Sequence, residues 1–140
     1  LIAFYDNIYS DSIVNNKFMN IIRDIRNAAA HSSCLINQLF KPHNPGWQVD
    51  STISNYIKTI PDISPAVRRK NLNYQVVYNF IILLYVYDQV VPEGKAKLRR
   101  HKEIKDLFNI RMISHKDYFQ SNNKITGVYN FVKKVVDSLS

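Results

Sequence analysis

The chain has 140 residues, of which 46% are hydrophobic, with a single cysteine and a formal net charge of +8. That length buries enough surface to hold a core without disulfides, and one cysteine excludes both an internal disulfide and a four-cysteine zinc site. A reducing, cytoplasmic location is therefore expected. The most apolar run, FIILLYVY at 80–87, is far shorter than the roughly 20 residues of a membrane span, and no secretory leader is evident, so no membrane partner is predicted.

Helical periodicity dominates the N-terminal part of the chain. Apolar residues recur at three- and four-residue steps from Ile13 to Ala29, and the pattern continues through Leu39. This spacing predicts an amphipathic helix over the whole stretch. Asp11 or Ser12 is placed to cap its N-terminus.

Proline and glycine interrupt the helical pattern twice in the middle of the chain. KPHNPGWQVD at 41–50 ends the first helical stretch, and PDISP at 61–65 is the second break. Between the two breaks, residues 51–59 predict a short helix that is capped by Asp50 or Ser51.

The second half of the chain predicts three further helical segments. Residues 66–91 are apolar around most of the circumference of a helix, which is typical of the central, buried helix of a bundle. VPEGK at 91–95 turns the chain, a basic helix follows to about Phe108, and a last amphipathic helix is expected around 128–136. Because no segment alternates convincingly with a period of two, we predict an all-α helical bundle, formed as a single domain over residues 1–140.

Positive charge is concentrated in the second half. Residues 67–140 hold fourteen basic and six acidic residues, whereas residues 1–66 hold five of each. The peak is KAKLRRHKEIK at 95–105, where six of eleven residues are Lys or Arg. A concentrated positive field attracts polyanions through counterion release, although a solvated basic helix face remains the alternative. The candidate phosphate contacts of this stretch are Arg99, Arg100 and Lys102.

The stretch IIRDIRNAAAHSSCLINQL at 21–39 places polar side chains on a helix that is rich in small residues. On a straight helix Arg23, Asn27 and His31 lie at i, i+4 and i+8 along one edge, and Arg26 lies about 140° around the axis from His31. A long arginine side chain can reach across that gap because only alanines lie between. Polar groups on an alanine-lined surface, next to a stripe that packs into the core, predict a groove.

The sequence IRNAAAHSSCLINQLF is similar to the motif of HEPN domains, written R-(polar)-x3-H with Asn as a common polar residue. The fuller string, with LIAFYDNIYSD before it and a tryptophan-containing loop after it, resembles abortive infection proteins of the Abi-like (AbiD/AbiF) family. The likeness covers about the first fifty residues. Since family members usually have a longer N-terminal portion, the resemblance implies a C-terminal fragment or a truncated form.

The resemblance implies a HEPN-like bundle and a metal-independent endoribonuclease used as a toxin in antiviral defence. It implies no cofactor, RNA as substrate, a homodimer, and a regulatory RNA or antitoxin as a further partner. Carried over to this sequence, the catalytic residues are Arg26, Asn27 and His31. For Arg23 two interpretations stay open: it positions phosphate, or it forms a surface salt bridge with a neighbouring Asp. Neither a carboxylate cluster for Mg²⁺ nor a His/Cys set for zinc accompanies the motif, so no metal ligands are predicted.

The chemistry of RNA cleavage suits these residue types. RNA supplies its own nucleophile, the 2′-OH, so the protein must take one proton, give another, and stabilise charge on the phosphate. Histidine can act as acid or base near neutral pH, and arginine presents a planar fork of donors to phosphate oxygens. Asn27 can fix the tautomer of the histidine or hold a phosphate oxygen. One helix supplies only His31, and a symmetric dimer would supply the second histidine.

Structural and functional alternatives stay open at this point. His31 could be a satisfied interior histidine, and Arg26 could pair with Asp6 or Asp11. Cys34 could be a thiolate activated by His31, but a buried small hydrophobe is the favoured interpretation. The whole chain could instead be a non-catalytic HEPN-type module that binds RNA, nucleotide or a partner protein, or a plain structural bundle.

Overall fold

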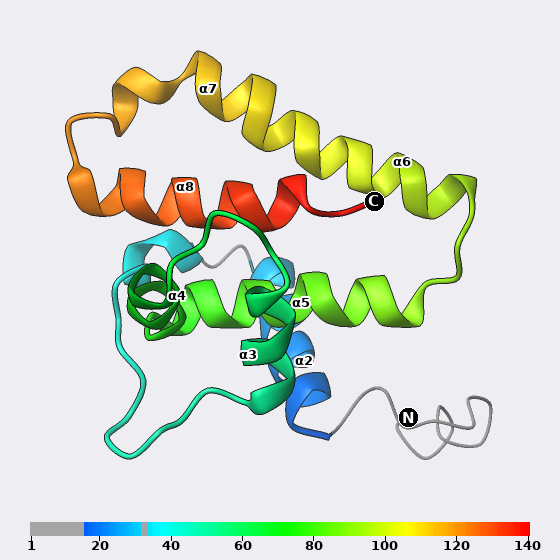
Figure 1. Ribbon diagram of the computed structural model, residues 1–140, viewed down its shortest axis with the longest axis horizontal. Helices are drawn as coiled ribbons and strands as arrows, with labels where there is room; N and C mark the ends of the chain where they lie inside the picture. The colour runs from blue at the N-terminus through cyan, green and yellow to red at the C-terminus, as the bar shows by residue number, and fades with distance from the viewer. Residues whose placement is uncertain (1–15, 32–33) are drawn as a thin grey trace.

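The computed structural model describes residues 16–31 and 34–140 and folds this part of the chain into helices (Figure 1). The described elements are, in order, α2 (Asn16–Ala30), η1 (Leu35–Gln38), α3 (Ser51–Lys58), α4 (Pro65–Leu72), α5 (Gln75–Val90), α6 (Lys95–Asp106), η2 (Leu107–Arg111), α7 (Met112–Ser114), η3 (Lys116–Tyr118) and α8 (Asn123–Asp137). Within these ranges the only β-type pairing is an isolated bridge between Pro42 and Tyr74. The predicted all-α fold is confirmed. None of these helices combines the length and apolar character needed to cross a membrane.

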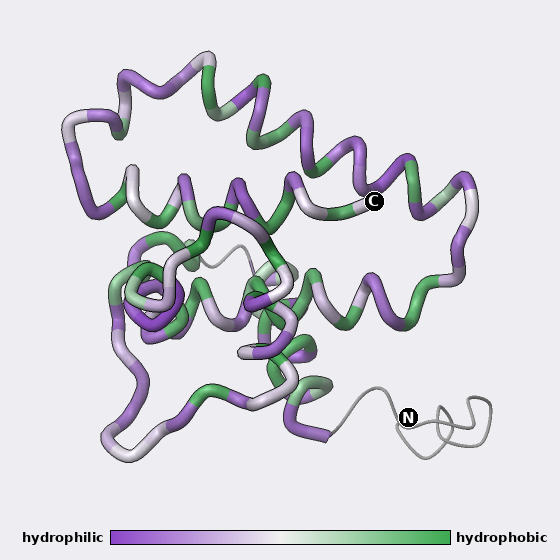
Figure 2. The backbone as a smooth tube through the Cα atoms, in the orientation of Figure 1, coloured by the Kyte–Doolittle hydropathy of each residue, from purple (hydrophilic) through white to green (hydrophobic). Residues whose placement is uncertain are grey.

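Helix α5 is the centre of the arrangement, because α2, α3, α4 and α8 all pack against it. In Figure 1, α8 runs alongside α5, and the long arm formed by α6, η2 and α7 runs along the other side of α8. The hydropathy colouring in Figure 2 shows mostly hydrophilic residues along the outer edge of the α6 part of that arm. The expected packing of the motif-bearing helix on α5 is confirmed, and one link is the edge-to-face contact between Phe18 of α2 and Tyr85.

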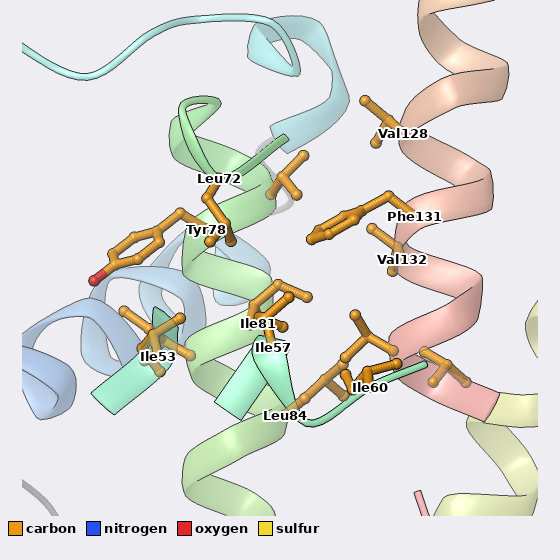
Figure 3. Close-up of a cluster of buried hydrophobic side chains, with 14 of the residues drawn as sticks. Ile53, Ile57, Ile60, Leu72, Tyr78, Ile81, Leu84, Val128, Phe131 and Val132 are labelled. Carbon is orange, nitrogen blue, oxygen red and sulfur yellow. The ribbon is translucent and has the colours of Figure 1, made fainter. Parts of the chain in front are cut away.

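The core lies where α3, α4, α5 and α8 meet (Figure 3). Helix α8 contributes apolar residues at three- and four-residue steps, so the amphipathic helix predicted around 128–136 is confirmed within Asn123–Asp137. Phe131 is 1% exposed, and Ile81 on the facing side of α5 is fully buried. Burial of such side chains is the main stabilising contribution to a fold of this size. Further core residues are Ile53, Ile57, Leu72, Tyr78, Val135 and Val136.

Two predicted helix boundaries are wrong, and the first concerns the N-terminal helix. It ends at Ala30 rather than near Leu39, and the amide of His31 closes its last turn on the carbonyl of Asn27 at 3.0 Å. Cys34 is extended, and the chain resumes as the short turn η1. Of the periodic apolar residues beyond the break, Leu35 and Ile36 are 40% and 71% exposed, whereas Leu39 is partly buried and packs against the core. The predicted N-caps Asp11 and Ser12 lie outside the described residues.

The second wrong boundary is the single central helix predicted over residues 66–91. The structure divides it into α4 and α5 because residues 41–43 bind the backbone at the junction. The amide of Gln75 donates to the carbonyl of Lys41 at 2.9 Å, and the amide of His43 donates to the carbonyl of Asn73 at 3.3 Å. These hydrogen bonds come from a distant loop, so helical periodicity did not reveal them.

The short helix predicted over residues 51–59 is confirmed as α3. Asp50 is its N-cap, and its carboxylate accepts from the amide of Thr52 at 2.9 Å. The break at 61–65 contains Asp62 with a φ of 63°, a left-handed conformation that ends helical geometry. Ser64 then caps α4, and Pro65 occupies its first turn, where no amide donor is required.

Candidate functional site

The C-terminal end of α2 presents the predicted catalytic side chains to solvent. Arg26 and His31 are exposed, and Asn27 is half-buried. The guanidinium of Arg26 donates to the side-chain oxygen of Asn27 at 3.0 Å, so these two side chains are held together. Arg23 is also exposed and lies 3.7 Å from the carboxylate of its neighbour Asp24. The structure thus brings Arg26 and Asn27 together and places His31 at the end of the same helix.

The exposure of His31 separates the alternatives left open by the sequence. Within residues 16–31 and 34–140, no hydrogen bond or ion pair involves its imidazole, so it is not an interior histidine satisfied by the fold. Among those residues, Arg26 has an amide partner and no carboxylate partner; Asp6 and Asp11 lie outside them. The expected burial of Cys34 is wrong, since this cysteine is exposed.

The surface around the motif is small and apolar. Ala28 is half-buried and Ala29 and Ala30 are exposed, so no bulky side chain of α2 separates Arg26 from His31. After the break, Leu35 is 40% exposed and Ile36 is 71% exposed. The site can therefore offer a permanent positive charge, an amide and an imidazole to a ligand. Among the described residues of this site, His31 is the side chain suited to proton transfer near neutral pH.

The candidate phosphate contacts on α6 are already paired with acids of the same helix. Arg100 contacts Glu103 at 2.6 Å, and Arg99 lies 3.7 Å from the same carboxylate. Lys102 contacts Asp106 at 2.7 Å. The hydrogen bond from Arg100 lowers the pKa of Glu103, and the hydrogen bond to Asp106 raises the pKa of Lys102. The positive field of this helix is therefore partly neutralised by its own carboxylates.

Sequence reasoning missed a buried charged cluster at the start of α6. Lys97 is 3% exposed, although it belongs to the basic run that was interpreted as a surface. Its ammonium donates to the backbone carbonyl of Asp88 at 2.7 Å and to Glu93 at 2.5 Å, and it lies 3.3 Å from the Asp88 carboxylate. His101, 4% exposed, lies 3.5 Å from that carboxylate. The i,i+4 spacing of Glu93 and Lys97 was the one signal in the sequence that indicated this pairing.

A pocket of about 350 Å³ lies beside the same cluster, between the end of α3 and the C-terminal residues. Asp88, Tyr56 and Ser138 contribute polar atoms to its wall. Burial raises the pKa of Tyr56 to about 12, so its hydroxyl stays protonated at neutral pH. This pocket is remote from the motif in sequence and contains none of the predicted site residues.

No family model, curated protein or solved structure matches the chain. The described part of the chain contains no group of three or more His, Cys, Asp or Glu side chains arranged to hold a metal ion. Any functional assignment therefore depends on the chemistry of the residues at the end of α2 and on the charge around them.

Proposed function

We propose that the chain forms the catalytic part of a metal-independent endoribonuclease of the HEPN type that acts in abortive infection, a form of phage defence. The observation that carries the proposal is the arrangement of Arg26, Asn27 and His31 on the solvent-exposed end of α2. The fold uses none of these side chains in its core, whereas cleavage of RNA uses all three residue types. The resemblance of residues 21–39 to the R-(polar)-x3-H motif points in the same direction.

Each side chain has a chemical role in this proposal. His31 transfers a proton to or from the 2′-OH or the leaving 5′-oxygen. Arg26 stabilises the charge on the phosphate through its planar fork of donors. Its hydrogen bond to Asn27 uses one guanidinium nitrogen and leaves donors on the others for phosphate oxygens.

A second copy of the chain would complete the acid–base pair. The reaction uses both an acid and a base, and one α2 helix supplies one histidine. The exposed Leu35 and Ile36 lie four and five residues after His31 in the sequence and offer apolar surface for such a contact. A two-fold axis close to the ends of two α2 helices would bring two copies of His31 to one phosphate.

The test is cleavage of single-stranded RNA in the presence of EDTA by the purified protein. We expect products with a 2′,3′-cyclic phosphate and no cleavage of DNA, because DNA lacks the 2′-OH. His31→Ala should lower the rate by about two to four orders of magnitude. Arg26→Lys should also lose RNA cleavage, because the single ammonium group of lysine does not reproduce the planar fork of donors of the guanidinium.

Matched controls lie on the same helix. Asn20→Ala and Lys17→Arg change exposed residues at the other end of the described helix, and both should cleave like the parent. Circular dichroism should show equal helix content in all variants. A requirement for divalent metal, or full activity of His31→Ala, would contradict the proposal. RNA binding by the parent without any cleavage would favour the non-catalytic binding module, an alternative consistent with the single histidine at the described site.

A further inference from the structure

The corner between α7 and α8 carries an aromatic pair that the core does not use. Tyr118 is 79% exposed, the highest value among the exposed large hydrophobic residues that the structure describes. Its ring is stacked on that of His115 with centroids 5.3 Å apart and planes 7° apart. The next residue, Phe119, turns inward and packs against Tyr129 with centroids 5.3 Å apart, which anchors the turn. The pair is thus held on a fixed turn with one tyrosine face open to solvent.

Three lysines that have no acidic partner among the described residues lie at the same end of the molecule. Lys116 belongs to η3 itself, and Lys124 lies in the first turn of α8. The ammonium of Lys124 is 5.6 Å from the centre of the Phe40 ring, and Lys41 is the residue that follows Phe40 in the chain. Within the described ranges, none of the three forms an ion pair. Figure 1 shows η3 and the start of α8 on the same side of the molecule as η1.

This end differs from α6 in both charge and chemistry. On α6 the cations Arg99, Arg100 and Lys102 are paired with carboxylates of their own helix. Between residues 111 and 124 the only acidic residue is Asp117. An exposed aromatic ring flanked by unpaired cations is the combination that binds single-stranded nucleic acid, because each nucleotide offers a base face and a phosphate. Duplex RNA hides its base faces, and an acidic protein surface has no bases to stack.

We propose that the η3–α8 surface, formed by His115, Lys116, Tyr118, Lys124 and Lys41, binds single-stranded RNA. Tyr118 stacks on an unpaired base, and the three lysines contact phosphates on either side of it. The inference rests on the proposed function in taking RNA as the ligand, but it concerns a surface away from the α2 motif. Phe40 and Lys41 follow the short helix η1, which comes after His31 in the chain.

Binding is measured by fluorescence anisotropy with a labelled oligouridylate on the full chain carrying His31→Ala, so that the RNA stays intact. Tyr118→Ala should weaken binding roughly five- to a hundredfold, the usual value of one base–aromatic stack. Tyr118→Phe keeps the ring and should bind like the His31→Ala parent. The triple variant Lys41→Gln, Lys116→Gln, Lys124→Gln should make the slope of log affinity against log salt shallower by about two units.

The matched control removes the same number of charges from α6 through Arg99→Gln, Arg100→Gln and Lys102→Gln. It should change the salt slope less than the lysine triple variant does. The proposal would be overturned if Tyr118→Ala binds RNA as tightly as the parent, or if the α6 variant changes the salt slope more than the lysine triple variant. It would also be overturned if polyglutamate competes with the labelled RNA as well as unlabelled RNA does, and that result would assign the surface to an acidic protein. RNA cleavage by the unmutated chain is measured in a separate assay. If Tyr118→Ala binds RNA normally while the unmutated chain cleaves RNA, only the proposed binding surface is wrong. If the unmutated chain does not cleave RNA, the proposed nuclease function is wrong.

Discussion

The end of α2 and the interface between α5 and α8 are both helical, but the first exposes its side chains to solvent and the second buries them in the core. Where α5 faces α8, Ile81 is fully buried and Phe131 is 1% exposed, and packing there holds the helices together. At the end of α2, Arg26 and His31 extend into solvent beside exposed alanines. The comparison shows that stability and the proposed chemistry depend on different residues. Substitutions can therefore test one without disturbing the other.

The largest effect on stability is expected from Phe131→Ala in α8. Phe131 is 1% exposed and lies in the cluster with Ile57 and Ile81, so its truncation removes buried area and leaves a cavity. We expect a loss of about 3–5 kcal/mol in the free energy of unfolding, measured by urea denaturation. Asn130→Ala, at the exposed neighbouring position, should change it by less than about 0.5 kcal/mol. Equal effects of the two substitutions would remove the contrast between core and surface.

Lys97→Met tests the buried charged cluster. Removal of the ammonium leaves the backbone carbonyl and carboxylate of Asp88 without the donor that lies 2.7 Å and 3.3 Å from them. We expect a loss of about 2–3 kcal/mol, because the carbonyl and the carboxylate of Asp88 lose their buried donor, although the Asp88 carboxylate is 30% exposed and is partly compensated by water. Lys95→Met, an exposed lysine in the same first turn of α6, is the control. If both variants are equally stable, Lys97 contributes no more than a surface lysine.

The elements that the sequence predicted are those set by local chemistry. Asp50 caps α3, and the spacing of apolar residues in α8 identifies its buried face, so both follow from neighbouring residues. The junction between α4 and α5 depends on backbone hydrogen bonds from residues 41 and 43, which are distant in sequence. The end of α2 at Ala30 was missed because the apolar spacing continues across it, although Ile36 is exposed.

For the candidate site, too, the sequence predicted which residues belong together but not which charges are buried or paired. The motif identified Arg26, Asn27 and His31 as a group, and the structure places all three at one helix end. Charge density alone did not separate Lys97, which is buried, from Lys102, which is exposed. Nor did it show that cations on α6 have acidic partners, because pairing depends on side-chain positions. A stretch rich in lysine and arginine thus predicts a positive helix but not which of its charges are available to a ligand.

Ionisation of Tyr56 should make stability pH-dependent in alkaline solution. Burial is the largest cause that raises its pKa to about 12 from the usual value of 10. Because the folded state favours the neutral phenol, the stabilising effect is complete below pH 10 and is lost as the pH rises through about 12. We expect a loss of about 2 kcal/mol over that interval, measured by chemical denaturation at each pH. The loss should be smaller in Tyr56→Phe, and an identical pH profile would show that this hydroxyl is not responsible.

The smallest effect on stability is expected from Asn27→Ala. This variant tests most directly whether the end of α2 contributes to the proposed chemistry without contributing to the stability of the core. Asn27 is half-buried, and within residues 16–31 and 34–140 its one side-chain hydrogen bond joins it to the exposed Arg26. A hydrogen bond between exposed neighbours contributes little, and alanine is the better helix former, so the two effects nearly cancel. The free energy of unfolding should change by less than about 0.5 kcal/mol, while RNA cleavage should fall because Arg26 loses its anchor. A destabilisation as large as that of Phe131→Ala would instead make Asn27 part of the core and would end the separation between the two regions.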